Sequence, residues 1–138
     1  MQSITDPVLG ELDFVHMWKG KCTVVFCGRE YHVQLAVQGS SHAPVSHIQR
    51  QAYEAALHRL SETNSMGPLM EYCRIDAPED SIDPESIPYI VHPETLLITY
   101  EGGFGLLCSY DYDPEHGLAI YALSPSGEMK VGIQDDIL

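Results

Sequence analysis

Residues 30–38 alternate apolar and polar side chains without a break, and no other stretch limits the possible folds of this chain as strongly. Because successive side chains of a β-strand point to opposite faces, the pattern predicts a strand with one buried and one solvent-facing side. Gly28 and Arg29 precede it and predict a tight turn, since glycine supplies the positive φ that short hairpin loops require. The buried side is expected to consist of Tyr31, Val33, Leu35 and Val37.

Further strand patterns occupy both ends of the chain and enclose a helical middle. Turn-forming residues, glycine and proline above all, separate most of these strands. The additional strands are expected at residues 8–15, 21–27, 95–101, 104–112, 117–123 and 129–133.

The middle of the chain begins with a helix signal. Ser46 and Gln49 have the spacing of a capping box, so a helix is expected to begin there and to run to about Glu62. Apolar residues recur within it at helical spacing and predict a buried stripe. The stripe is expected to contain Ile48, Ala52, Ala56 and Leu60.

A shorter helix is expected over residues 66–73. Residues 76–93 are rich in proline and acid and predict an irregular connection with one helical turn near residues 84–87. The order of elements is therefore β-β-β-α-α-β-β-β-β. Such blocks predict an α+β fold in a single domain, residues 1–138. Its mostly antiparallel sheet of about six to seven strands is expected to carry two helices packed on one face.

Charge is distributed very unevenly along the chain. Residues 1–74 contain seven acids and six bases, a net charge of −1, whereas residues 75–138 contain thirteen acids and one base, a net charge of −12. If the two halves fold together, a strongly negative surface is expected, which attracts basic proteins and accelerates their association by about 10- to 1000-fold. Acidic side chains can equally serve solubility alone, so both interpretations stay open.

The charge and the terminal segments restrict the partners and the compartment. Contacts with phosphates need Lys and Arg, so neither nucleic acid nor an anionic membrane is expected as a partner. Residues 1–14 lack the basic and apolar segments of a secretory signal, which predicts a cytoplasmic protein. The four cysteines form no CxxC pair and are expected to be reduced thiols: Cys22, Cys27, Cys73 and Cys108.

Acidic residues of the second half are the main candidates for contacts with a partner. They are Asp76, Glu79, Asp80, Asp83, Glu85, Asp111, Asp113 and Glu115. Aromatic side chains could add the buried anchors from which protein interfaces gain most of their binding energy. The candidates for this role are Trp18, Tyr89, Tyr100, Tyr110 and Tyr112. Trp18 could instead cover the edge of a small core.

No arrangement of residues predicts catalysis. The chain contains no HExxH, no GxSxG and no GxxxxGK[ST] motif, so neither an enzyme nor a cofactor is expected. Asp111, Asp113 and Glu115 have a spacing similar to that of a calcium loop, but His116 occupies the position where such a loop needs Gly. A small-ligand, divalent-metal or weakly enzymatic site in this hairpin is kept as an alternative.

Several stretches resemble one group of proteins. These are residues 6–12 (DPVLGEL), residues 18–20 (WKG), residues 46–53 (SHIQRQAY), and the closing YDYDPEHGLAIYAL and GIQDDIL. They resemble a family of small uncharacterised bacterial cytosolic domains, some of which look like immunity proteins of bacterial toxin systems such as contact-dependent inhibition. The resemblance implies a non-enzymatic protein that binds a toxin C-terminal domain, for example a basic nuclease. A structural domain is the third possibility, and the oligomeric state is not predicted.

Overall fold

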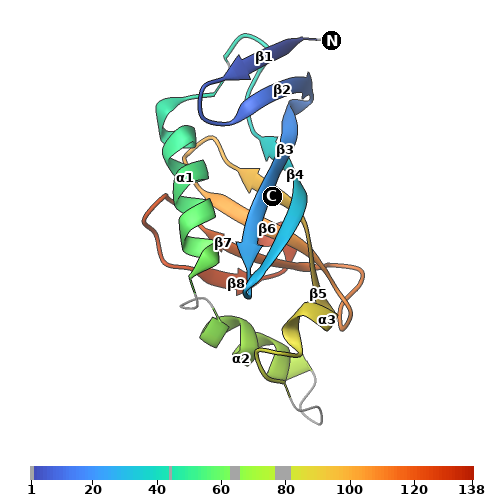
Figure 1. The fold of residues 1–138 in the computed structure, drawn as a ribbon. Helices are drawn as coiled ribbons and strands as arrows, with labels where there is room; N and C mark the ends of the chain where they lie inside the picture. The colour runs from blue at the N-terminus through green and yellow to red at the C-terminus, as the bar shows by residue number, and fades with distance from the viewer. Residues whose placement is uncertain (1, 44, 63–65, 77–81) are drawn as a thin grey trace.

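The computed structural model describes residues 2–43, 45–62, 66–76 and 82–138 and shows one sheet with three helices (Figure 1). The strands are β1 (Ser3–Asp6), β2 (Gly10–Val15), β3 (Met17–Phe26), β4 (Arg29–Val37), β5 (Val91–Ile98), β6 (Phe104–Tyr110), β7 (Leu118–Ala122) and β8 (Lys130–Gly132). The helices are α1 (His47–Ser61), α2 (Met66–Asp76) and α3 (Ile87–Ile90), and a 3-10 turn, η2 (Gln134–Asp136), follows β8. The predicted α+β class is confirmed.

The eight strands lie side by side in the order in which they occur in the chain. All neighbouring pairs are antiparallel except β4 and β5, which are parallel. A parallel pair needs a long crossover connection. Here that connection consists of α1, α2 and α3, so the helical middle of the chain produces the single parallel step in the sheet.

The first forty residues form four strands where three were expected, so the sheet has eight strands instead of the predicted six to seven. Residues 8–15 were predicted as a strand, but Val8 and Leu9 belong to a turn because the Asp6 carboxylate accepts both of their amides at 2.9 and 3.0 Å. Residues 3–6 before this turn form β1 and pair with β2. His16, at a φ of 65°, then reverses the chain between paired Val15 and Met17. Residues 16–20, predicted as a connection, therefore lie mostly within β3.

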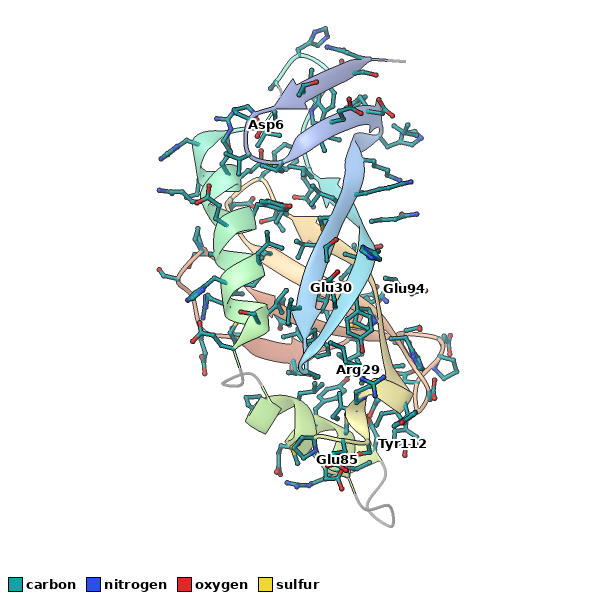
Figure 2. All side chains as sticks on the ribbon, in the orientation of Figure 1. Asp6, Arg29, Glu30, Glu85, Glu94 and Tyr112 are labelled. Carbon is teal, nitrogen blue, oxygen red and sulfur yellow. The ribbon has the colours of Figure 1, made fainter. Side chains whose placement is uncertain are left out.

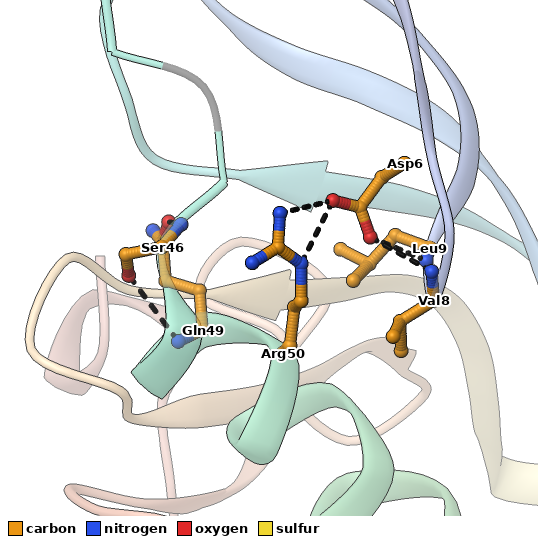
Figure 3. A network of polar contacts seen from close by, with 6 residues as sticks. All are labelled: Asp6, Val8, Leu9, Ser46, Gln49 and Arg50. Atoms are coloured by element: carbon orange, nitrogen blue, oxygen red, sulfur yellow. Dashed lines mark hydrogen bonds and ion pairs between the residues drawn. The ribbon is translucent and has the colours of Figure 1, made fainter.

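Helix α1 begins as the sequence predicts. Ser46 Oγ accepts the amide of Gln49 at 3.3 Å, and the Gln49 side chain accepts the amide of Ser46 at 3.1 Å, completing the capping box (Figure 3). The predicted stripe is wrong at one position, because Ile48 is 41% exposed and Gln49 takes the buried place beside Ala52, Ala56 and Leu60. Gln49 can be buried because its Nε2 donates to the carbonyls of Gln38 and Thr99.

The helices do not both pack on one face of the sheet as predicted. Helix α1 lies along the inner side of the curled sheet, where it contacts β3, β5 and β6 (Figure 1). Helix α2 lies beyond the end of α1, at the same end of the molecule as α3, and contacts β8. None of the helices formed by the described residues is long and apolar enough to cross a membrane.

Apolar side chains fill both sides of the sheet, but unequally. The larger cluster lies between α1 and the inner side and includes Trp18, Leu35, Leu60 and Phe104. A smaller cluster on the outer side consists of Ala36, Leu97, Leu107, Ala119 and Ile137. Because Ile137 follows η2, the C-terminal segment covers the outer side over the later strands.

Candidate functional site

The described carboxylates predicted to meet a partner belong to segments that meet at the end of the molecule carrying α2 and α3, where Figure 2 labels Glu85 and Tyr112. Tyr110, the last residue of β6, donates its hydroxyl to Asp76 Oδ2 at 2.9 Å, and the amide of Asp111 donates to Ile90 O at 3.0 Å. These contacts join α2, α3 and the β6–β7 hairpin. We call this region the acidic end. Its described carboxylates are Asp76, Asp83, Glu85, Asp111, Asp113 and Glu115; Glu79 and Asp80 lie outside the described residues.

Two more carboxylates from the C-terminal segment lie beside the acidic end. Asp135 and Glu115 both act on His116, whose pKa is raised above its usual value chiefly by the hydrogen bond to Asp113. Asp136, Asp113 and Asp76 all contribute to the raised pKa of Tyr72, after burial as the largest cause. The negative potential therefore comes from segments far apart in the sequence.

Histidines, rather than lysines or arginines, contact the described carboxylates at this end. His92 Nε2 lies 3.0 Å from Asp111 Oδ1, and His116 Nδ1 lies 3.1 Å from Asp113 Oδ1. No described carboxylate of residues 82–138 lies within 4.0 Å of a charged nitrogen of a described Lys or Arg. The negative charge of the acidic end thus stays largely uncompensated within the described part of the protein.

The nearby arginines are engaged elsewhere. Arg74 donates from Nη2 to Ile82 O at 3.2 Å, which attaches α2 to the segment before α3. Arg29 lies over the ring of Tyr89, with Cζ 5.7 Å from the centroid. Both arginines tie the backbone and aromatic groups of this end together, and neither forms an ion pair with its described carboxylates.

Exposed apolar groups accompany the charge. Tyr89 is 68% exposed, Ile75 is 73% exposed and Tyr112 is 37% exposed. Tyr112 packs edge-on against Tyr110, with ring centroids 5.6 Å apart. Since Tyr110 also bonds to Asp76, which follows Ile75 directly, aromatic and aliphatic surface lies beside the carboxylates.

Two of the predicted anchors are not at the surface. Trp18 is fully buried: it packs edge-on against Phe14 at 5.1 Å, and its Nε1 donates to Ser40 O at 3.1 Å. Trp18 is the second residue of β3 and belongs to the core cluster on the inner side of the sheet, which corrects its assignment as a partner-binding residue. Tyr110 is 1% exposed and serves the acidic end as a support below Tyr112. Tyr100 is exposed, but it lies at the opposite end of β5.

The hairpin considered for a metal has its carboxylates engaged with histidines. Asp113 accepts from both the backbone amide and the ring of His116, and Asp111 contacts His92. Across the described residues, no three or more His, Cys, Asp or Glu side chains are grouped so as to hold a metal ion. The geometry therefore gives this alternative no ligand set.

The cysteines lie among apolar neighbours and none is in a disulfide. Burial raises the pKa of the Cys22 thiol to about 11 and, together with the nearby Cys73, that of Cys27 to about 12. Burial raises the pKa of Cys108 as well. A thiol with a raised pKa supplies little of the thiolate that nucleophilic catalysis and metal binding require.

One feature was not predicted from the sequence. A groove of about 500 Å³ lies over the paired strands β3 and β4, beside Glu94 of β5, and is lined by Lys21, Cys22, Thr23, His32, Val33, Gln34 and Glu94. The alternation of residues 30–38 already places His32 and Gln34 on the polar face of a strand. Glu94 carries no such signal, because it is the extra residue of a bulge between Pro93 and Thr95.

No family model, curated protein or solved structure matches this chain. Function therefore has to be inferred from the side chains themselves. The acidic end combines carboxylates that form no ion pair with a described Lys or Arg with exposed aromatic and aliphatic groups, a combination typical of a surface that binds another protein.

Proposed function

We propose that this protein is a non-enzymatic immunity protein, which binds a basic bacterial toxin domain through its acidic end and thereby neutralises it. One observation carries the proposal: carboxylates from three separate segments converge at one end, and no described Lys or Arg forms an ion pair with them. Small cytoplasmic immunity proteins need only a surface that is complementary to the toxin. The acidic end of this chain is a candidate for such a surface.

The charge and the apolar groups have different roles in this proposal. Uncompensated carboxylates attract a basic partner over a long range and mainly raise the association rate. Affinity comes from a few side chains that lose their water on binding. Tyr112, Tyr89 and Ile75 are suited to this role because they are exposed beside the carboxylates.

The experiment first isolates the partner by pull-down from the native host and then measures its association rate with this protein as a function of salt. Raising the ionic strength from about 0.01 M to about 1 M shortens the Debye length from about 30 Å to about 3 Å. We expect the association rate to fall steeply over this range, by about 10-fold or more. A rate that is independent of salt would remove the electrostatic role of the acidic end.

Matched variants locate the effect. The combination of Glu85→Gln, Asp111→Asn and Glu115→Gln removes three charges from the acidic end while preserving the shape of each side chain. The combination of Glu11→Gln, Glu54→Gln and Glu101→Gln removes the same charge from exposed positions elsewhere. We expect only the first combination to slow association strongly. Equal effects would mean that overall charge matters and the acidic end does not.

The same protein tests the metal alternative. A ligand at about 100 times its dissociation constant stabilises a protein by about 2.7 kcal/mol if it binds only the native state. Thermal unfolding with Ca²⁺, Mn²⁺ and Zn²⁺ should therefore show no upward shift if the proposal is right. A shift that Asp111→Asn abolishes would favour the metal site instead.

A further inference from the structure

The two parallel strands of the sheet separate along half of their length. Strand β4 pairs with β5 from Gln34 to Val37, opposite Thr95 to Ile98. Residues 30–33 of β4 and residues 91–94 of β5 also belong to these strands, but they do not pair with each other. We call this opening the β4–β5 fork, and the groove lined by residues of β3 and β4 and by Glu94 lies beside it.

The bulge in β5 explains the fork. Pro93 pairs with Cys108 and Thr95 pairs with Leu107, so Glu94 is an additional residue on the β5 side. A bulge bends its strand and increases the local twist. The bend leads β5 away from β4 on the side of Glu94 that faces the acidic end, while β5 stays paired with β6.

The fork leaves unused hydrogen-bonding groups on β4. The amide of Gln38 donates to Ile98 O at 2.9 Å, so the backbone of the even-numbered residues faces β5. Hydrogen bonding alternates along a strand, which directs the N–H and C=O groups of Glu30 and His32 toward the fork. Within the described residues, neither backbone has a hydrogen bond on that side. Such a row of free groups is a template for another strand.

The side chains around the fork indicate what an added strand would contain. On the outer side, Glu30 and Glu94 are exposed carboxylates without a described Lys or Arg ion pair. On the inner side, Val33 belongs to the apolar core and the partly buried Cys22 packs against that core. Lys21 lies where the strands are still paired, opposite Gln34, and Arg29 is held over Tyr89. A strand with alternating basic and apolar residues would therefore match both sides.

We propose that the β4–β5 fork accepts an extended, basic segment of the partner, which pairs as a strand with β4 through Glu30 and His32. The inference rests on the proposed function for the sign of the partner's charge. The fork is continuous with the acidic end, because His92, in the part of β5 that does not pair with β4, contacts Asp111. A partner held by the acidic end thus lies next to free backbone groups.

The test is amide hydrogen exchange of the whole protein, with and without a capped peptide of alternating Lys and Val. In the free protein, the amides of Glu30 and His32 should exchange rapidly, while those of Tyr31 and Val33, which face β3, exchange slowly. At about 100 times its dissociation constant, the peptide should slow both rapid amides by about 100-fold. The same peptide with N-methylated backbone positions keeps its charge but loses its donors, and it should protect neither amide.

A variant pair tests the charge at the fork. Glu94→Gln should weaken peptide binding by about two- to five-fold, as expected for a solvent-exposed ion pair. Glu101→Gln, at the other end of β5, should leave it unchanged. Slow exchange of Glu30 and His32 in the free protein would show a closed fork and overturn the inference.

The inference that a partner strand pairs with β4 would also be overturned if the peptide did not bind, or if it bound without protecting the amides of Glu30 and His32. If the toxin domain still associated in a salt-dependent way through the acidic end, the proposed function would stand without strand pairing at the fork.

Discussion

Removal of the Asp6 carboxylate should destabilise the protein more than removal of any other described acid. The side chain is almost fully buried, and both of its oxygens are used (Figure 3). Oδ1 accepts from Arg50 at 2.8 and 2.9 Å, while Oδ2 accepts the amides of Val8 and Leu9. One carboxylate therefore closes the β1–β2 turn and holds it against α1.

The magnitude follows from the donors left behind by Asp6→Ala. Removing one partner of a buried ion pair costs about 3–5 kcal/mol, and each buried donor left unsatisfied costs about 1–3 kcal/mol. Arg50 is one-third exposed and can turn to water, so the cost lies near the lower limit. We expect a loss of about 3 kcal/mol, which lowers the melting temperature by about 10 °C for a domain of this size.

The assay is urea and thermal unfolding beside the control Glu11→Ala, an exposed carboxylate on β2. The control should change the free energy of unfolding by less than about 0.5 kcal/mol. Burial raises the pKa of Asp6, but hydrogen bonds from Arg50, Leu9 and Val8 outweigh it and leave the pKa below its ordinary value of 3.8. The stabilisation by ionised Asp6 is therefore present above that value and is lost as the pH falls through the folded pKa. Equal losses for both variants would refute the reasoning.

Three other perturbations have defined outcomes. Tyr110→Phe removes the hydroxyl that donates to Asp76 and should cost about 1 kcal/mol in urea unfolding. Arg59→Met should destabilise the β7–β8 loop, since Arg59 donates to two of its carbonyls, and hydrogen exchange there should accelerate. His116 has a raised pKa because of Asp113, so its stabilising effect should be present below pH 6.5 and disappear as the pH rises through the folded pKa. His116→Gln should abolish this pH dependence of unfolding.

The sequence predicted the elements that depend on neighbouring residues. The capping box of Ser46 and Gln49 and the alternation of residues 30–38 are local signals, and α1 and β4 follow them. Two predictions failed for different reasons. Val8 was placed in a strand, but Asp6, only two residues before it, accepts its amide in a turn. Ile48 was placed in the core because nothing local shows that the Gln49 side chain donates to the distant carbonyls of Gln38 and Thr99 and is buried instead.

The candidate site was predictable in its charge but not in its geometry. Residues 75–138 contain thirteen acids and a single base, Lys130, which indicates an acidic surface wherever those residues lie. Whether they converge depends on α2, α3 and the β6–β7 hairpin meeting at one end, and contacts such as Tyr110 to Asp76 have no sequence signal. The fork was even harder to predict from the sequence, because the position of a single bulge residue, Glu94, determines where β4 and β5 separate.

The two ends of the molecule illustrate why uncompensated charge can be kept for binding. Two unit charges 4 Å apart interact by about 1 kcal/mol in water but by about 4 kcal/mol at the effective dielectric constant of about 20 near a protein surface. Asp6 is buried, so it needs Arg50 within the same chain. Asp111 and Glu115 are exposed, so their mutual repulsion costs the free protein little. Once a partner excludes water from them, the same carboxylates attract basic groups several times more strongly, and the missing internal cations become an advantage.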